Sequence, residues 1–117
     1  MAYDEALANR IRMALAGRPG VTEKEMFGGV SFMVDGKMCV GVQKDDLMLR
    51  VSEEQFAEAL RRPHVRPMDF TGRPMVGFLY VAPAGCEADS DLRVWVNMAF
   101  AHAQSLPAKK TSRKRKL

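Results

Sequence analysis

The residues best suited to chemistry in this chain are a cysteine and a histidine that lie far apart in the sequence. Cys39 and His64 could form a thiolate–imidazolium pair, the arrangement that activates a cysteine nucleophile. No signature of a cysteine enzyme surrounds either residue, and Cys39 falls in the middle of an expected strand. A buried cysteine and a loop histidine explain the two residues more simply, because free cysteine is among the most buried residue types.

Metal binding and acid–base catalysis have no better basis in the sequence. The cysteines and histidines have neither CxxC nor HxxxH spacing, so we expect no metal site and no cofactor. Two pairs of adjacent carboxylates, Asp45-Asp46 and Glu53-Glu54, lie at an expected turn and an expected helix start, where solvated acids are ordinary. Adjacent side chains diverge, so neither pair makes an acid–base dyad. The sequence therefore predicts a protein that is not an enzyme.

Two glycine-containing segments could bring backbone amides close to a phosphate, since glycine has no side chain to block an anion. The lysine and the serine or threonine of a P-loop are missing after both Gly28-Gly29 and Gly72, so a bend or bulge beside a strand is favoured. Arg73 lies before Pro74 and is expected to be extended. It either pairs internally with Asp69 or presents its guanidinium to the carboxylate of a partner.

Length and composition bound the architecture. A chain of 117 residues, 47% of them hydrophobic, has material for one core and too little for two. No apolar run approaches the roughly 20 residues that span a bilayer, and the N-terminus lacks the order of a signal peptide. We therefore expect a cytoplasmic protein without membrane contact. Two cysteines, one in a strand and one in a loop, do not indicate a disulfide framework.

Six cations are concentrated in residues 107–117, where no acid occurs. They are Lys109, Lys110, Arg113, Lys114, Arg115 and Lys116. The rest of the chain has 12 basic and 14 acidic residues, so a body of net charge −2 carries a basic tail. Pro107 ends a helical pattern, and so polar a run cannot offset its ordering entropy. A domain over residues 1–106 is therefore expected to precede a disordered tail, which either contacts nucleic-acid phosphates or is a solvated terminus.

The elements that must position these residues begin with a helix from about Asp4 to Ala16, with Asp4 as its N-cap. Three runs with period two follow and predict antiparallel strands that share one buried face. Their apolar positions are Val30, Phe32 and Val34; Met38, Val40 and Val42; and Leu47, Leu49 and Val51.

Register follows from parity, because a one-residue slip moves every side chain of a strand to the other face. Keeping the apolar residues of the first two runs on one face requires a loop with an odd number of residues. This predicts a three-residue loop over residues 35–37 with Gly36 at positive φ, in place of a two-residue Asp-Gly turn. Keeping the second and third runs on one face requires an even loop, and residues 43–46 are four polar residues.

A capping box formed by Ser52 and Gln55 predicts a second helix that runs to about Arg61. Three prolines then hold an extended connection, in which residues 68–71 could form a short strand. The strand that follows has apolar residues at alternate positions, namely Val76, Phe78 and Tyr80.

A third helix is predicted to start at Asp89-Ser90-Asp91. Its expected core residues are Leu92, Trp95, Val96, Ala99, Ala103 and Leu106. The resulting order, α-β-β-β-α-β-β-α, predicts an α+β domain in which helices pack on an antiparallel sheet of about five strands.

The parity argument also predicts the second face of the sheet, which is neither cleanly polar nor strongly apolar. It should carry Ser31, Met33, Cys39, Gly41, Met48, Arg50, Gly77 and Leu79. Methionines adapt to varied partner surfaces, so this face could dock a protein or a second copy of the chain. Equally, a helix or the segment 62–75 could cover it. The candidate interaction residues are Met33, Met48, Arg50 and Arg73.

Several short segments, taken together, resemble one family. They are the opening MAYDEAL, Met26-Phe27-Gly28-Gly29, Met38-Cys39, Leu47-Met48-Leu49-Arg50, Met68-Asp69-Phe70 and Gly72-Arg73-Pro74-Met75. Over about residues 1–106 the chain resembles the N-terminal domain of the TfoX/Sxy family. The resemblance implies an α+β fold, a bacterial regulator of competence genes that assists a cyclic-AMP-responsive transcription activator, and no catalytic activity. Full-length regulators carry a second, helical domain, whereas a basic tail follows the first domain here, so a stand-alone domain is expected.

Two hypotheses of function follow. The first is a non-catalytic regulatory domain that binds a protein partner, or its own copy, through the second sheet face and the surroundings of Arg50 and Arg73. The second is a nucleic-acid-associated protein that is attached through the six cations of its tail. No aromatic residue lies among those cations, so the tail is not expected to recognise bases.

Overall fold

The computed structural model describes residues 3–26, 28–68 and 75–106, which form three α-helices and six β-strands. In chain order they are α1 (Glu5–Ala14), β1 (Val21–Met26), β2 (Gly29–Val34), β3 (Lys37–Gln43), β4 (Asp46–Arg50), α2 (Glu53–Ala59), β5 (Val65–Met68), β6 (Met75–Val81), a short 3₁₀ turn (Pro83–Gly85) and α3 (Asp89–Ser105). The α+β class with an antiparallel sheet is confirmed, with six strands in place of about five.

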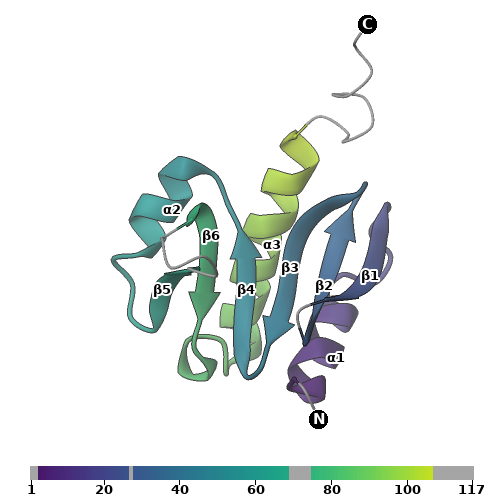
Figure 1. The fold of residues 1–117 in the computed structure, drawn as a ribbon, viewed down its shortest axis with the longest axis horizontal. Helices are drawn as coiled ribbons and strands as arrows, with labels where there is room; N and C mark the ends of the chain where they lie inside the picture. Colours follow the sequence, from purple (N-terminus) through teal and green to yellow (C-terminus); the bar gives the residue numbers. More distant parts are fainter. Residues whose placement is uncertain (1–2, 27, 69–74, 107–117) are drawn as a thin grey trace, which may run out of the picture.

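The six strands form one sheet in the order β1-β2-β3-β4-β6-β5, and every neighbouring pair is antiparallel. Figure 1 shows β1 at one edge, β5 at the other and β4 near the middle. The first four strands therefore follow one another as a meander. After α2 the chain forms the far edge strand, β5, and then returns as β6, which lies between β5 and β4.

The strand that the sequence analysis missed is β1, whose residues are mostly polar. Its sequence VTEKEM has no apolar alternation, which is the signal that identifies a half-buried strand. An edge strand does not need that pattern, because much of its surface faces water. Its backbone pairs with β2 from Val21 opposite Val34 to Met26 opposite Gly29, so pairing rather than burial defines it.

The hairpin between β2 and β3 differs from the expected one. Asp35 and Gly36 form a two-residue turn, and both have positive φ, 51° and 83°. Two left-handed residues are what a tight hairpin turn of the primed type requires, and Asp-Gly supplies them. The three-residue loop predicted over residues 35–37 is therefore wrong.

A β-bulge explains why the parity argument failed at this hairpin. Phe32 pairs with Val40, but Met33 pairs with Met38, which leaves Cys39 as an extra residue on β3. Past the bulge the strand changes face, so Met38 lies on the side away from the buried core and Cys39 lies within it. The sequence analysis had placed both residues on the opposite faces.

The next hairpin agrees with the expected parity. Val42 and Leu47 pair on one face, and Gln43 pairs with Asp46, so the even connection is confirmed. It is shorter than the four residues expected, because Gln43 and Asp46 belong to the strands and only two residues remain in the turn. Gly28, with φ of 77°, likewise lies in the turn between β1 and β2, as the structural interpretation of Gly28-Gly29 predicted.

The helix starts agree closely with the sequence analysis. The Asp4 carboxylate accepts a hydrogen bond from the Leu7 backbone N–H at 3.1 Å, which satisfies one orphan amide of α1. Ser52 and Gln55 form the predicted capping box at the start of α2. Each helix ends within two residues of its predicted end where one was given, α1 at Ala14 and α2 at Ala59.

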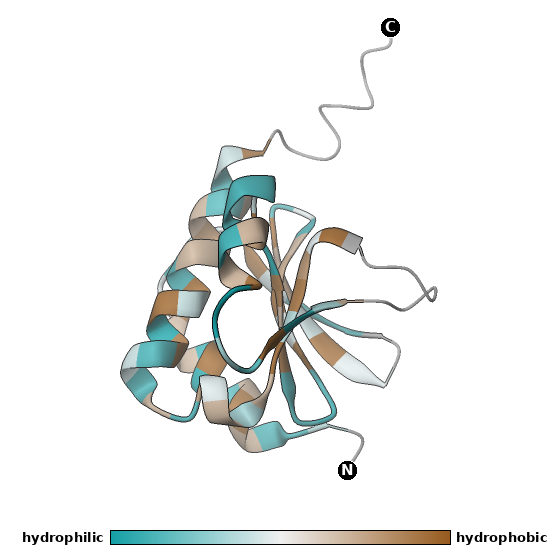
Figure 2. Ribbon diagram, turned by 90° about the vertical axis from the view of Figure 1, so that its left-hand side faces the viewer, coloured by the Kyte–Doolittle hydropathy of each residue, from teal (hydrophilic) through white to brown (hydrophobic). Residues whose placement is uncertain are grey.

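All three helices lie on one side of the sheet, as Figure 2 shows, and enclose the main core with it. Of the residues predicted for α3, all but Leu106 are buried there, because Leu106 already follows the helix as its C-cap. The buried Lys37 side chain is unusual in this layer, and its ammonium donates to the Leu106 carbonyl at 2.8 Å. The β2–β3 hairpin is thus tied to the C-terminal end of α3.

Candidate functional site

The side of the sheet opposite the helices carries a second apolar cluster (Figure 2). Met48, Met68 and Tyr80 are buried at its centre, and the half-buried Met38 and Phe78 pack against them. We call the whole surface the open face, and define it by Met33, Met38, Met48, Arg50, Arg66, Met68, Phe78 and Tyr80. On the open face this apolar cluster lies beside two arginines, and no helix of the described chain covers it.

Strand pairing positions the central residues of the open face. Met48 on β4 lies opposite Tyr80 on β6 and opposite Gly41 on β3. A Cβ atom at Gly41 would lie 2.8 Å from the terminal methyl carbon of Met48 and 2.4 Å from the Val30 carbonyl oxygen. Gly41 therefore leaves the space in which Met48 lies flat across the neighbouring strand.

Two arginines lie beside the cluster, each over an aromatic ring. The Arg50 guanidinium carbon is 5.5 Å from the centroid of the Phe78 ring, and that of Arg66 is 4.6 Å from the centroid of Tyr80. Cation–π contact fixes each guanidinium while leaving its N–H groups able to donate. Arg66 uses one of them on the Asp46 carboxylate at 2.7 Å.

Arg50 differs from Arg66 because it has no acidic partner among the described residues. It is half-buried and pairs in register with Phe78. A guanidinium that is partly removed from water and has no carboxylate is a favourable place for an acid from outside the chain. Arg50 is therefore the residue of the open face best placed to bind a carboxylate from another molecule.

The candidate residues predicted from the sequence have different outcomes. Met33, Met48 and Arg50 do lie together on the open face, and their role in binding stays a prediction. The prediction that Leu79 lies on this face is wrong, because Leu79 pairs with Leu49 and lies inside the main core. Arg73 and the six cations of the tail lie outside the described residues.

Sequence reasoning missed Arg66, Met68, Phe78 and Tyr80 as members of this surface. The reason is that β6 is apolar on both faces, with Leu79 and Val81 facing the helices and Phe78 and Tyr80 facing away. The sequence analysis identified alternate apolar positions at Val76, Phe78 and Tyr80, but in a strand that is apolar on both faces such alternation does not show which face is covered by helices. The strand β5 also starts three residues earlier than the segment 68–71 predicted for it, since an edge strand tolerates Pro67.

The cysteine–histidine pair is not assembled. Cys39 lies on β3 in the core, and burial raises the pKa of its thiol to about 12. His64 is exposed directly before β5, and two strands, β4 and β6, lie between β3 and β5 in the sheet. A thiol with so high a pKa stays protonated at neutral pH and is a poor nucleophile.

The carboxylate pairs also have structural explanations in the described chain. Asp46 binds Arg66, and Glu53 and Glu54 are exposed in the first turn of α2, where acids favour the helix dipole. Among the residues that the structure describes, no three of the histidine, cysteine and carboxylate side chains are grouped as metal ligands would be. Both cysteines are free thiols.

Comparison with known proteins gives one family. The profile of the TfoX N-terminal domain matches residues 13–103 of the 117, from within α1 to near the end of α3. The chain therefore belongs to the family of TfoX N-terminal domains. A comparison with curated proteins finds no significant relative. Across the three described ranges, the helices are too short or too polar to cross a membrane.

Proposed function

We propose that this TfoX N-terminal domain is a non-catalytic regulatory domain that binds a protein partner through its open face. The observation that carries the proposal is Arg50, a half-buried guanidinium without an acidic partner in the described chain, beside an apolar cluster rich in methionine. The partner that fits is a protein segment that presents an apolar side chain next to a carboxylate.

The chemistry of the open face favours such a partner. Methionine side chains are unbranched and polarizable, so they adapt to the shape of an incoming side chain. Arginine and aromatic residues are enriched at the energetic centres of interfaces, and here Arg50 and Arg66 lie over the rings of Phe78 and Tyr80. A carboxylate that reaches Arg50 would form a charge-assisted, bidentate contact in a place already partly free of water.

The cellular role that we propose follows the family. A bacterial, cytoplasmic regulator that acts on competence genes with a transcription activator would need a docking domain of this kind and no active site of its own. The buried, protonated Cys39 supports the non-catalytic part of this proposal.

The alternative is attachment to nucleic acid through the tail. The six cations of residues 107–117, on a chain whose remaining residues carry a net charge of −2, favour contact with nucleic-acid phosphates at the tail. Such binding depends steeply on salt, because it releases counterions.

The test is capture from lysate with and without nuclease treatment, at two salt concentrations, with four proteins: the full chain, the chain ending at Leu106, Arg50→Glu, and Arg61→Glu. Arg61 is an exposed arginine after α2 and away from the open face, so it is a matched control. We expect one protein to be recovered by the full chain, by the chain ending at Leu106 and by Arg61→Glu, and to be bound at least about tenfold more weakly by Arg50→Glu.

Two outcomes contradict the proposal. Equal recovery by Arg50→Glu and Arg61→Glu would show that the open face is not the binding surface. Recovery that requires residues 107–117 and disappears after nuclease treatment would favour attachment through the tail.

A further inference from the structure

A second feature lies on the opposite side of the molecule, between the helices. A pocket of about 440 Å³ opens between α1, the turn that follows it and the first half of α3. Its lining residues are Arg10, Met13, Ala14, Arg18, Asp89, Leu92 and Arg93. This volume lies in the range of small-molecule sites in proteins.

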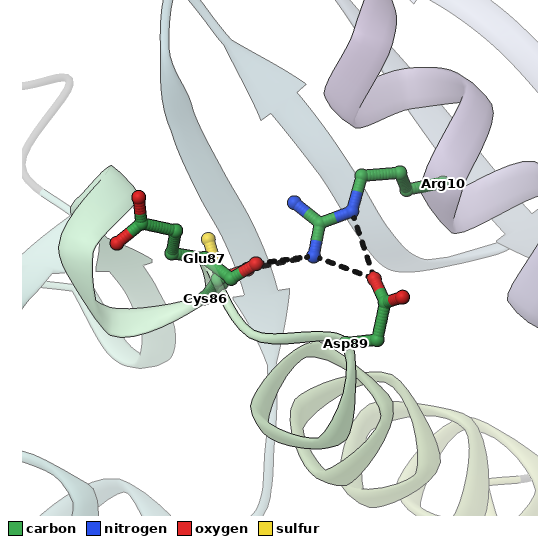
Figure 3. Close-up of polar contacts among 4 residues, drawn as sticks. All are labelled: Arg10, Cys86, Glu87 and Asp89. Carbon is green, nitrogen blue, oxygen red and sulfur yellow. Dashed lines mark hydrogen bonds and ion pairs between the residues drawn. The ribbon is translucent and has the colours of Figure 1, made fainter.

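Arg10 is fixed at one end of the pocket (Figure 3). Its Nη2 donates to the carbonyl oxygens of Cys86 and Glu87 at 3.0 and 2.9 Å and to the Asp89 carboxylate at 3.0 Å. Its Nε donates to the same carboxylate. The other terminal nitrogen, Nη1, makes no hydrogen bond within the described residues. Arg10 is thus held in one orientation with a donor group left over.

Arg18 is held almost as firmly. Its guanidinium carbon lies 4.7 Å from the centroid of the Phe100 ring, and its Nη2 donates to the Asn97 side-chain oxygen at 2.5 Å. Neither contact neutralises its charge, because Phe100 and Asn97 are uncharged. The charge of Arg18 is therefore available to a ligand in the pocket.

Arg93 is the one arginine of the pocket with no structural task in the described chain. It is exposed on α3, one turn after Asp89, and no ion pair or ring contact engages it. Three guanidinium groups and a single carboxylate give the pocket an excess of two positive charges.

The rest of the lining is apolar. Leu92 is buried at the base, Ala14 is half-buried, and Met13 is 77% exposed at the rim, an unusual position for so large an apolar side chain. A ligand with an apolar group would cover Met13 and remove its surface from water.

We propose that this pocket binds a small organic anion, a phosphate monoester or carboxylate attached to an apolar group. The guanidinium groups of Arg18 and Arg93 hold the anionic group, with Arg10 supplying a fixed donor, because planar guanidinium groups match both anions in a bidentate manner. Met13, Ala14 and Leu92 contact the apolar group. The site is separate from the open face, since the sheet lies between the two.

The test is a titration of ¹⁵N-labelled full-length protein with three probes of similar size: phenyl phosphate, benzoate and the neutral benzyl alcohol. We expect at least one anion to shift the amide resonances of α1 and of the first turns of α3 at millimolar concentration, and benzyl alcohol to leave them unchanged. Tighter binding of phenyl phosphate assigns a phosphate ligand, and tighter binding of benzoate a carboxylate ligand.

Arg93→Gln is the decisive variant, because this residue is exposed and its replacement leaves the packing intact. We expect it to weaken binding of the better anion by about tenfold or more, as loss of a charged hydrogen-bond donor does, while Arg61→Gln binds as the unmodified protein does. Equal binding by Arg93→Gln overturns the proposal. So does equal binding of benzyl alcohol, or the absence of any shift with either anion.

Discussion

Arg50 influences the main core side as well as the open face. The pKa of His102 on α3 is lowered from its ordinary 6.5 by burial and, to a smaller extent, by the positive charge of Arg50. A histidine with a lowered pKa binds its proton more readily in the unfolded chain. Protonation of the unfolded chain therefore lowers the free energy of unfolding as the pH falls below about 6.5, the pKa of an unfolded histidine.

We predict that Arg50→Gln raises the pKa of His102 part of the way back toward 6.5. Removing the charge removes the smaller cause, and burial remains. The measurement is a titration of the His102 imidazole protons by NMR, with Arg61→Gln as the control. An unchanged or lower pKa of His102 in Arg50→Gln would contradict the prediction and show that the charge of Arg50 does not act on His102.

At the scale of single residues, local burial was easier to predict from the sequence than distant contacts. The burial of Cys39 was foreseen from its residue type, although its face was not. Arg10 could not be foreseen, because its partners Cys86, Glu87 and Asp89 lie far along the chain, and nothing in a sequence marks a contact at that separation.

At the scale of elements, β1 is held against the domain by an ion pair as well as by backbone pairing. The Arg12 guanidinium on α1 binds the Glu23 carboxylate on β1 through two of its nitrogens, at 2.5 and 2.8 Å, and lies 5.7 Å from the centroid of the Phe32 ring. The hydrogen bond from Arg12 lowers the pKa of Glu23. The polar sequence of β1 thus supplies an attachment that its few apolar residues cannot.

We predict that Glu23→Gln lowers the free energy of unfolding by less than about 1 kcal/mol at neutral pH, because both side chains are partly exposed and screened by water. The lowered pKa means that the stabilisation is present above the unfolded value of 4.5 and is lost as the pH falls through the lower, folded value. Urea unfolding should therefore show a difference between the two proteins at neutral pH that disappears in acid. Glu25→Gln, on the same strand, is the control, and an equal loss there would contradict the assignment to Arg12.

The elements themselves were mostly predictable, and their faces were not. Caps and breakers are local, so Asp4, Ser52 and Asp89 marked the helix starts correctly. Faces depend on strand parity, which the bulge at Cys39 reverses without any sequence signal. The sequence analysis consequently placed Met33, Met48 and Arg50 on the correct face of the sheet. It wrongly assigned two core residues, Cys39 and Leu79, to the same face.

At the scale of the molecule, one lysine joins the β2–β3 hairpin to the C-terminal end of the described fold. Lys37 is only 7% exposed, and its ammonium reaches the Leu106 carbonyl at the C-terminal end of α3. A cation there also opposes the negative end of the helix dipole. The hairpin, the helix and the point where the chain leaves the domain are thereby fixed to one another.

We predict that Lys37→Met lowers the free energy of unfolding by about 1–2 kcal/mol, as loss of a charged hydrogen bond at a helix end does. The chain that ends at Leu106 should be at least as stable as the full chain, because its new terminal carboxylate can still accept the hydrogen bond from the Lys37 ammonium. Thermal or urea unfolding of the two variants checks both statements. A stable Lys37→Met protein would show that the carbonyl is satisfied by water instead.

The charged edge strand has a further consequence for how copies of this protein meet. If two β1 strands paired antiparallel with the helices of both copies on one side, the register would have to be centred on a residue. Centred on Lys24, it would place that lysine against its own copy and Glu23 opposite Glu25; centred on Glu23, it would oppose two glutamates. Like charges therefore oppose the pairing of two β1 edges in these two registers, which disfavours edge-to-edge contact between copies through this strand.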